Sequence, residues 1–330
     1  MKQKVVYFPK SGGANAYPVR MQNILASFSD VEGLNLKSTI REILKCNFSK
    51  KDVLILNWIE SDIIGKNGQV SLTGILKVLL KVFIFKLKFK KIIFVRHNIY
   101  PHKTDKKNSH VAKKLVDKLE SLFDHKVVHS PVYAKNGYEY IPHPLYKHPL
   151  VIDNNTDECE NNKFIIFGRI LEYKKFEVII ESFPAEQQLL IVGHCEDYGY
   201  LDKIKALIRE KNNITIIPSY LDDSAAKELI NSTGGLIISH ADDDMIVSGS
   251  FFYGLTIGVK MYAVSTPFLK WAEEQFGTEI IETFPDVVSL CKRINKRPIR
   301  EHISNETISH INSFFSDETI ASSFSRLCQK

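Results

Sequence analysis

Short apolar stretches alternate with longer amphipathic ones along this chain, and they do so in two separate series. In the first series, the predicted strands cover residues 4–8, 52–58 and 91–97, with a helix near 18–28. In the second series, they cover residues 163–167, 188–192, 214–217 and 235–239. This alternation is typical of β-α-β units, which build parallel sheets with helices on their faces. The pattern therefore predicts an α/β protein with two Rossmann-like halves.

A polar segment separates the two series. Residues 142–149 contain three prolines, and residues 153–162 consist almost entirely of Asp, Asn, Glu and Thr. Such a composition is unsuited to the interior of a helix or strand. We therefore expect an N-terminal domain at 1–148 and a C-terminal domain at 163–303, followed by a helical segment at 304–330 that crosses back to the N-terminal domain.

Composition narrows the compartment and the classes of ligand. The 330 residues carry a formal charge of +6, which leaves nucleic acid, an anionic membrane and phosphorylated small molecules open. The apolar run at 5–8 is too short for the core of a signal peptide, so we expect a cytoplasmic protein. The five cysteines are widely spaced, which fits neither a disulfide framework nor a zinc site. No metal is expected.

The clearest local motif follows the predicted strand at 163–167. Gly168 allows a tight turn, and Arg169 and Lys174 then emerge at the carboxyl edge of the sheet, where open α/β folds bind ligands. Arginine offers paired contacts to phosphate oxygens and lysine offers a compact charge, so together they suit a diphosphate. The alternative is that both are solvated loop cations.

A second motif opens a predicted helix after the strand at 235–239. Ser248, Gly249 and Ser250 would present unpaired backbone N–H groups and the positive end of the helix dipole to an anion. The alternative is an ordinary capped helix.

A double glycine follows the first predicted strand. Gly12 and Gly13 allow the backbone to approach a ligand closely, or they form a plain tight turn. The spacing matches neither the dinucleotide fingerprint nor the phosphate loop of nucleoside triphosphatases, so no bound cofactor is implied.

These motifs resemble those of the GT-B glycosyltransferases, and in particular the retaining, family 4-like enzymes of bacterial polysaccharide biosynthesis. Such enzymes open the C-terminal domain with a strand, Gly-Arg and a nearby Lys before a helix. The next strand and glycine are similar to residues 189–193, and the resemblance is best over 163–271. It implies two Rossmann-like domains with parallel sheets that face a central cleft.

The resemblance also implies roles for individual residues. Arg169 and Lys174 would bind the pyrophosphate of a UDP- or GDP-linked sugar, and the helix start at 248–250 would meet its distal phosphate. The loop with Gly12 and Gly13 would face the donor. Asn15 and Tyr17, which follow in the same loop, are expected on the acceptor side.

One departure from the family stands out. Many relatives carry two glutamates separated by seven residues, and the matching positions here are Met245 and Tyr253. Asp242 and Asp244 lie close enough to replace the first glutamate and contact the sugar hydroxyls. Tyr253 occupies the position to which ribose recognition is normally assigned, so we expect it at the donor.

Polar side chains end two further strands of the N-terminal half. Glu60 and Asp62 follow the strand at 52–58. His97, Asn98 and His102 follow the strand at 91–97, in a run similar to a motif of several polysaccharide glycosyltransferases. We expect these loops to face the acceptor, and the alternative for His97 is a structural histidine. If the reaction inverts configuration, Glu60, Asp62 or His97 is the nearest base, and if it retains configuration no dedicated base is required.

The segment at 72–91 is apolar and basic and contains no acid. Its lysines fit a helix in the headgroup region of an anionic bilayer, and Lys77, Lys81 and Lys88 share one helical face. The alternative is a helix that covers the sheet with a cationic exposed edge. The same lysines are weak support for nucleic acid, which we do not expect as a partner.

The sequence thus predicts a hexosyltransferase that moves a sugar from a nucleoside diphosphate to a glycan or lipid-linked acceptor in surface polysaccharide biosynthesis. It would act in the cytoplasm, attached peripherally to the inner face of the cell membrane. Two alternatives remain open, a non-catalytic subunit that binds nucleotide sugar or glycan, and a nucleotide-sugar epimerase.

Overall fold

The computed structural model describes residues 2–10, 15–102, 104–135, 137–152, 160–240, 245–296 and 303–329. Contacts divide the chain into two units. Of the described residues, unit 1 comprises 2–146, 245–247 and 314–329, and unit 2 comprises 147–240 and 248–313. The predicted boundaries put all of 304–330 in one crossing segment, whereas contacts assign 304–313 to unit 2.

Unit 1 is built from alternating strands and helices. Its strands are β1 (Lys4–Phe8), β2 (Asp30–Gly33), β3 (Lys51–Asn57), β4 (Phe89–Arg96), β5 (His125–Val128) and β6 (Tyr138–Tyr140). Its helices are α1 (Tyr17–Leu25), α2 (Leu36–Leu44), α3 (Leu72–Lys88), α4 (Ser109–Glu120) and α12 (Asp317–Gln329). Short 3-10 turns lie at η1 (Ile59–Ile63), η2 (Lys106–Asn108) and η3 (Pro131–Tyr133).

The six strands of unit 1 pair in the order β2-β1-β3-β4-β5-β6, and all of the pairs are parallel. The chain moves outward on one side of β1 to β2 and then returns to β3 on the other side. Doubly wound sheets bind ligands at such a reversal of strand order, outside the carboxyl ends of the strands. The ligand edge of unit 1 is therefore the region after β1 and β3.

Alternation along the strands gives unit 1 two cores. Val53 and Ile55 of β3 pack with residues of α1 and α12 on one face. Leu54 and Leu56 pack with residues of α3 and α4 on the other. Successive strand residues point to opposite faces, so the continuous apolar strand reflects a sheet that is covered on both sides.

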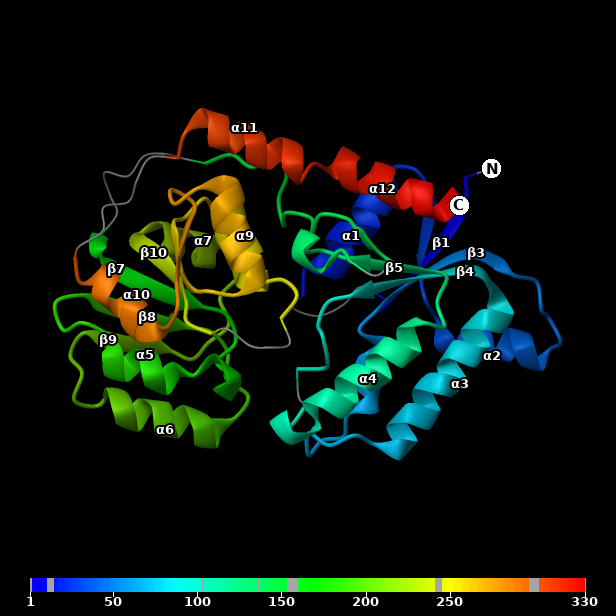
Figure 1. Ribbon diagram of the computed structural model, residues 1–330, viewed down its shortest axis with the longest axis horizontal. Helices are drawn as coiled ribbons and strands as arrows, with labels where there is room; N and C mark the ends of the chain where they lie inside the picture. The colour runs from blue at the N-terminus through cyan, green and yellow to red at the C-terminus, as the bar shows by residue number, and fades with distance from the viewer. Residues whose placement is uncertain are drawn as a thin grey trace. The chain divides into compact units, whose positions relative to one another are not determined.

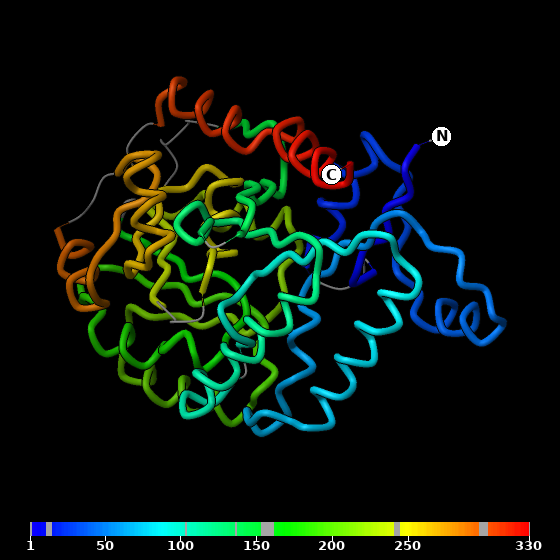
Figure 2. Tube along the Cα trace, turned by 45° about the vertical axis from the view of Figure 1, so that its right-hand side comes forward, coloured from blue at the N-terminus to red at the C-terminus, as the bar shows by residue number. Residues whose placement is uncertain are grey.

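The last helix, α12, is held to unit 1 by polar contacts at both ends. Near its start, Asp317 forms an ion pair of 2.5 Å with Arg20 of α1. At its end, the Lys91 ammonium donates to the carbonyl oxygens of Leu327 and Cys328. Figures 1 and 2 both show α12 (red) beside α1 (blue).

Unit 2 repeats the alternation. Its strands are β7 (Glu160–Phe167), β8 (Gln188–Val192), β9 (Ile214–Ile217), β10 (Thr233–Ile238), β11 (Met261–Val264) and β12 (Ile281–Phe284). Its helices are α5 (Phe176–Ser182), α6 (Tyr198–Ile208), α7 (Asp223–Asn231), α8 (Gly249–Ile257), α9 (Pro267–Phe276), α10 (Val287–Ile294) and most of α11 (Asn305–Phe314). One 3-10 turn, η4, covers Glu172–Lys174.

The sheet of unit 2 is also parallel, in the order β12-β11-β10-β7-β8-β9. The reversal of strand order lies between β7 and β10, so the expected ligand position is outside the carboxyl ends of these two strands. Figure 1 shows α5 and α6 on one side of this sheet and α7 and α9 on the other.

Close packing positions α8 at this sheet. A β-carbon on Gly254 of α8 would lie 2.7 Å from the sulfur of Met261 and 2.8 Å from the Cδ2 of Leu236. Glycine is therefore needed for the helix to lie directly against β10 and β11. The two parallel sheets with helices on both faces confirm the predicted α/β class. Within the described ranges, every helix falls short of the length and apolar character that a bilayer-spanning helix needs.

Candidate functional site

The carboxyl edge of β7 is formed by two glycine turns in direct contact. Gly168 follows β7 with φ of 112°, and Gly193 follows β8 with φ of 150°. A β-carbon on Gly193 would lie 2.1 Å from the carbonyl oxygen of Gly168. Backbone hydrogen bonds from Gly168 to Val192 and from Ile170 to His194 hold the two turns together. Only glycine fits here, which leaves room at the edge for the side chains that follow.

Lys174 is a buried cation at this edge. Its side chain reaches back to the turn, so that Nζ would lie 3.2 Å from a β-carbon on Gly168. Burial, together with the nearby charge of Arg169, lowers the pKa of Lys174 to about 8. Among the described residues, no acid forms an ion pair with it. A buried ammonium without a counter-ion is costly, and a bound anion removes that cost.

Arg169 provides a second and more mobile cation. Its side chain is 64% exposed and forms an ion pair of 3.4 Å with the equally exposed Glu196. Exposed pairs of this kind stabilise a protein by less than about 1 kcal/mol. The guanidinium can therefore turn to another anion at little cost.

The start of α8 supplies backbone donors at the same edge. Ser248 is the N-cap, and its hydroxyl accepts a hydrogen bond from the Phe251 N–H. Gly249 and Ser250 form the first turn, where N–H groups have no partner within the helix. The Ser239 hydroxyl at the end of β10 donates to the Lys174 carbonyl. Two cations and a helix N-terminus thus share the reversal point of the sheet, an arrangement whose charge and N–H donors are suited to an anion.

Tyr253 also lies at this edge. Its ring stacks on Phe167, the last residue of β7, with centroids 5.1 Å apart and an angle of 11° between the planes. A half-buried aromatic pair therefore occupies the position at which the sequence resemblance implies a carboxylate. It offers a flat surface for a sugar or base in place of a charged acceptor for hydroxyls.

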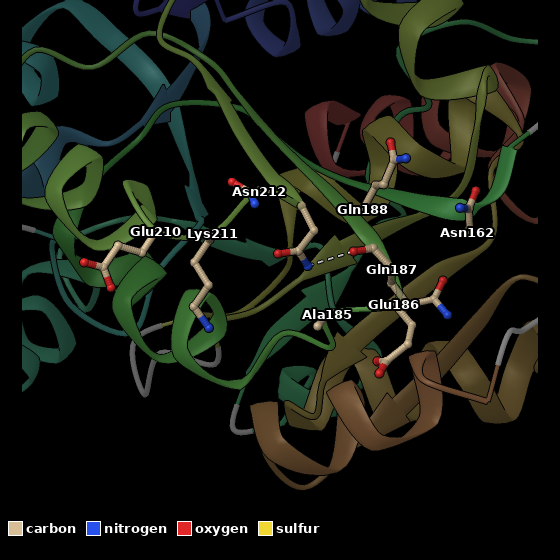
Figure 3. Close-up of a pocket in the computed structure, with 9 residues that line it drawn as sticks. Asn162, Ala185, Glu186, Gln187, Gln188, Glu210, Lys211 and Asn212 are labelled. Atoms are coloured by element: carbon tan, nitrogen blue, oxygen red, sulfur yellow. Dashed lines mark hydrogen bonds between the residues drawn. The ribbon is translucent and has the colours of Figure 1, made fainter.

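A pocket of about 440 Å³ lies at the opposite, amino edge of the unit 2 sheet (Figure 3). Its lining comes from the segments before β8 and β9, including Gln187, Glu210 and Lys211. The dashed hydrogen bond in Figure 3 joins the Asn213 side chain to the Gln187 carbonyl. This pocket holds one lysine and two glutamates and lies away from the strand reversal, so it does not suit a diphosphate.

In unit 1, a chain of hydrogen bonds through Asn57 and His97 connects the ends of β1, β3 and β4 at the ligand edge. The Asn57 side chain donates through Nδ2 to the Phe8 carbonyl at the end of β1, which leaves Oδ1 to accept. His97 Nε2 lies 2.9 Å from this oxygen and therefore donates to it. The imidazole stacks on Trp58 at 4.2 Å. Burial, reinforced by neighbouring histidines, keeps the pKa of His97 well below its usual range, so the ring is neutral.

Tyr17 is buried next to His97 and does not reach the surface. Only 2% of Tyr17 is exposed, and its hydroxyl donates to His129 Nε2 at 2.6 Å. His129 can accept at this nitrogen because its Nδ1 donates to the Ile141 carbonyl. The expected contact between Tyr17 and an acceptor is therefore wrong. Tyr17 instead packs edge-on against His97, with centroids 4.9 Å apart, and fixes the position of that ring.

Glu60 follows β3 and is completely buried. In the described part of the chain, neither carboxylate oxygen has a hydrogen-bond partner of normal geometry. Burial raises the pKa of Glu60 to about 7, against the opposing influence of Arg96 and His102. A pKa near neutrality suits a general base, but a completely buried carboxyl must become accessible before it can reach an acceptor.

Asp62 is engaged by two lysines of α3. It forms ion pairs with Lys81 and, at 3.3 Å, with Lys77. Burial opposes ionisation of Asp62, but the hydrogen bonds from Lys81 and Lys77 outweigh that effect and lower its pKa. A carboxylate held in its ionised form by two cations is a weak base, so the structure disfavours the predicted catalytic role of Asp62.

Arg96 is a residue that the sequence motifs did not single out. Its Nε donates to the Asn98 carbonyl at 3.0 Å, and its Nη2 donates to the Ile99 carbonyl. The buried Glu120 of α4 pairs with the same guanidinium at 2.9 Å. Arg96 thereby fixes the loop that begins with His97. The sequence does contain a signal that could have identified Arg96, because it is a charged residue at the end of an apolar strand.

The remaining predicted residues are spread around these two edges. Asn98 is buried and forms an isolated bridge with Met245. His102 and Asn15 are exposed, and the Asn15 side chain accepts a hydrogen bond from the Tyr17 N–H at the start of α1. Gly12, Gly13, Asp242 and Asp244 lie outside the described residues. Within the described ranges, no group of three His, Cys, Asp or Glu side chains is arranged to hold a metal ion.

Comparison with solved structures gives full-length matches at low sequence identity. Anabaena HepE, solved in complex with UDP and glucose, matches with a TM-score of 0.65 and 12% identity over 99% of both chains. Sucrose-phosphate synthase from Thermosynechococcus elongatus matches with a TM-score of 0.69 and 14% identity, over 99% of this chain and 98% of the other. AviGT4, a glycosyltransferase involved in avilamycin A biosynthesis, matches with a TM-score of 0.61 and 11% identity, over 99% and 97%.

No protein-family model and no curated protein sequence matches the chain. The structural matches cover both six-stranded parallel sheets and their helices. The chain therefore has the fold of the GT-B glycosyltransferases.

Proposed function

We propose that this protein transfers a hexosyl group from a nucleoside diphosphate sugar to a glycan or lipid-linked acceptor. The observation that carries the proposal is the buried Lys174, whose ammonium has no acidic partner among the described residues and lies at the strand reversal of unit 2. Arg169 and the start of α8 add charge and N–H donors at the same edge. These groups suit a diphosphate.

The matched structures support the choice of donor. HepE was solved with UDP and glucose and also with UDP-glucose, and both structures have the same fold as this chain. A uridine diphosphate sugar is therefore the first donor to test. Tyr253 and Phe167 would take the nucleoside or sugar ring on their flat surface in place of a carboxylate.

The chemistry follows from the assigned groups. The acceptor hydroxyl oxygen forms a bond with the anomeric carbon, the bond from that carbon to the diphosphate oxygen breaks, and the nucleoside diphosphate leaves with the electron pair. Arg169 and Lys174 stabilise the charge that develops on the departing diphosphate. The proton of the acceptor hydroxyl passes to a base, which is the diphosphate itself in a retaining reaction or a side chain in an inverting one.

We assign the acceptor to the ligand edge of unit 1. His97 is neutral there, and its ring is oriented by Asn57 and Trp58, so it can hydrogen-bond a sugar hydroxyl without a cost in charge burial. The two alternative bases are His97 and Glu60. We further propose that the acceptor belongs to surface polysaccharide biosynthesis and that the protein acts at the cytoplasmic face of the membrane.

A ligand screen followed by a turnover assay tests the proposal. Purified protein is melted in the presence of UDP, GDP, CMP and their sugars, because a ligand that binds only the native state raises the melting temperature. The preferred donor is then incubated with and without candidate acceptors, and released nucleotide and new glycan are measured. Binding without turnover would favour a non-catalytic subunit, and acceptor-independent change of the sugar would favour an epimerase. Absence of any nucleotide binding would overturn the donor assignment.

A further inference from the structure

Helix α3 exposes an apolar stripe that packs against nothing in the described structure of unit 1. Leu72, Leu76, Leu79, Leu80 and Phe83 are between 46% and 71% exposed. Their spacing of three and four residues places them on one side of the helix. Val78, Val82 and Phe85 on the opposite side are buried against the sheet. A helix that is apolar on both sides is covered on both sides in its working state.

Helix α2, next to α3, carries exposed apolar residues of its own. Ile40 and Leu44 are 36% and 77% exposed, and Phe48, just after the helix, is 53% exposed. The ion pair of 2.7 Å between Lys88 and Glu42 joins α2 to the C-terminal end of α3. Figures 1 and 2 show the two helices side by side. The exposed apolar residues of α2 and α3, with Phe48, are called the α2–α3 face below.

The α2–α3 face has exposed cations near it, and the nearest acids are already paired. Lys37, Arg41 and Lys45 on and after α2 are exposed, as is Lys86 on α3, and none of them pairs with an acid in the described part of the chain. The acids nearest to the face are already engaged: Glu42 pairs with Lys88, and Asp62 pairs with Lys77 and Lys81. The face therefore combines exposed leucines with unneutralised positive charge.

The three lysines that the sequence suggested as membrane contacts have a different role. Lys77, Lys81 and Lys88 do share one side of α3, but this side is turned toward Asp62 and Glu42. Lys88 is 1% exposed. Lys88 is therefore inaccessible to a headgroup, and Lys77 and Lys81 are already paired with Asp62 of η1.

We propose that the α2–α3 face docks unit 1 on an anionic phospholipid bilayer, with the leucines of α3 and Phe83 inserted at the level of the headgroups. The proposal rests on the membrane location given under the proposed function. A helix that lies in the interface needs an apolar side for the acyl chains and cations for the anionic headgroups, and α3 with α2 supplies both. The 17 residues of α3 lie along the surface for about 25 Å.

A second copy of the chain is a poorer occupant of the same face. Packing two α2–α3 faces together would bring Lys37, Arg41 and Lys86 of one copy against the same cations of the other. Like charges that approach in a partly desolvated interface repel, whereas anionic headgroups neutralise them. Charge complementarity thus selects the bilayer.

Sedimentation with vesicles tests the apolar part of the face. Wild-type protein should sediment with phosphatidylglycerol-containing vesicles, and the triple variant Leu76→Gln, Leu80→Gln, Phe83→Gln should lose binding by about tenfold or more. The matched control is Val111→Gln, Tyr198→Gln, Val288→Gln, which removes three exposed apolar side chains from α4, α6 and α10. This control should bind like wild type.

A second pair of variants tests the charge. Lys37→Glu, Arg41→Glu and Lys86→Glu together should weaken binding to anionic vesicles by about tenfold or more, because each substitution replaces attraction to the headgroups by repulsion. The control Lys114→Glu, Lys227→Glu, Lys270→Glu changes the net charge equally at exposed positions of α4, α7 and α9. If the control loses binding to the same extent, attraction by net charge explains the data and the docking face is wrong.

Nucleotide binding separates this proposal from the proposed function. Both triple variants of the face should keep the wild-type melting temperature and the wild-type shift with UDP, since α2 and α3 belong to unit 1. Wild-type protein that stays in the supernatant at low salt overturns the docking proposal and leaves the donor assignment intact. Self-association of wild type in solution that the Leu76, Leu80 and Phe83 variant abolishes, without vesicle binding, would assign the face to a second copy instead.

Discussion

The ammonium of Lys174 lies over Gly168, where a β-carbon would come within 3.2 Å of it. Gly168 also has φ of 112°, a conformation that other residues adopt only with strain. One glycine thus provides both the turn after β7 and the space for the cation. The proposed anion site therefore depends on the absence of a side chain at this position.

Gly168→Ala is therefore expected to damage the site as well as the fold. The strained backbone should lower the free energy of unfolding by about 1–3 kcal/mol, and the displaced Lys174 should weaken UDP binding. Urea unfolding and calorimetric titration measure the two effects. Gly137→Ala in unit 1 is the matched control, because Gly137 has φ of 83° but a β-carbon there meets only Lys126 at 3.7 Å. Equal loss of UDP binding in this control would show that general destabilisation is responsible.

The lowered pKa of Lys174 predicts how nucleotide affinity depends on pH. Because the folded pKa of about 8 lies below the ordinary value of 10.5, the free protein loses this charge as pH rises through about 8. UDP binds the charged form, so affinity should be constant just below that pH and fall by up to about tenfold per unit above it. Titrations between about pH 7 and pH 10 measure the slope.

Lys174→Arg is the informative variant for this prediction. Arginine keeps its charge throughout this range, so the affinity of the variant should no longer fall above about pH 8, even if it is lower overall. A variant with the same pH profile as wild type would assign the titration to another group.

Arg169 and Glu196 form an exposed pair in which only one member is expected to matter for binding. Arg169→Ala should weaken UDP binding and slow transfer, with a loss on the order of 2–4 kcal/mol in the transition state. Glu196→Ala should leave the melting temperature unchanged and should not reduce UDP affinity, because it frees the guanidinium. Calorimetry and initial rates on both variants decide the point. Wild-type rates in Arg169→Ala would place the diphosphate elsewhere.

Much of the architecture was predictable because parallel strands buried on both faces are continuous apolar runs. The runs at 163–167, 188–192 and 214–217 correspond closely to β7, β8 and β9. β2, with the sequence Asp-Val-Glu-Gly, and β6, with Tyr-Glu-Tyr, are short and only partly buried. These two segments are strands because they pair with β1 and β5, and their own sequences contain no strand pattern that would predict this.

The site was predictable where a backbone requirement accompanied the chemistry. Gly168 with the nearby Lys174 is such a case, since the turn and the cation appear together in the sequence. Tyr17 and Asp62 were misassigned because their roles depend on partners far along the chain, His129 for Tyr17 and Lys81 for Asp62. The sequence places both residues near strand ends, but only the tertiary structure shows which of them is buried or paired.

His97 is expected to affect transfer but not nucleotide binding. Its ring lies at the ligand edge of unit 1, whereas the residues proposed to bind the diphosphate belong to unit 2. His97→Ala should therefore lower the rate of transfer by about tenfold to a hundredfold or more with nearly unchanged UDP affinity. The control is His129→Gln, which perturbs the same buried cluster through the hydrogen bond to Tyr17. Equal loss of transfer in both variants, with equal loss of melting temperature, would make His97 a structural residue.

Glu60 should make the protein less stable as pH rises. Its folded pKa of about 7 lies above the ordinary value of 4.5, so the native state binds more protons than the unfolded state between these values. The stability associated with the neutral carboxyl is fully present below about pH 4.5 and is lost as pH rises through about 7, by an amount on the order of 3 kcal/mol. Glu60→Gln keeps the shape without the charge. It should match wild type in urea unfolding near about pH 4 and exceed it near about pH 8, by up to this amount.

The matched control for Glu60 is Glu120, a buried glutamate that has a cationic partner, whereas Glu60 has none among the described residues. Glu120 is 6% exposed and pairs with Arg96 at 2.9 Å, so Glu120→Gln leaves that guanidinium with less compensation and should destabilise the protein near pH 8. Opposite signs for the two variants near pH 8 are the expected result. If Glu60→Gln also destabilises the protein near pH 8, a cation or donor stabilises the Glu60 carboxylate in the folded state. The folded pKa of Glu60 is then not above its ordinary value, and the prediction is wrong. A Glu60→Gln protein that is more stable near pH 8 but inactive in transfer would identify Glu60 as the base, with its burial as the cost of a pKa near neutrality.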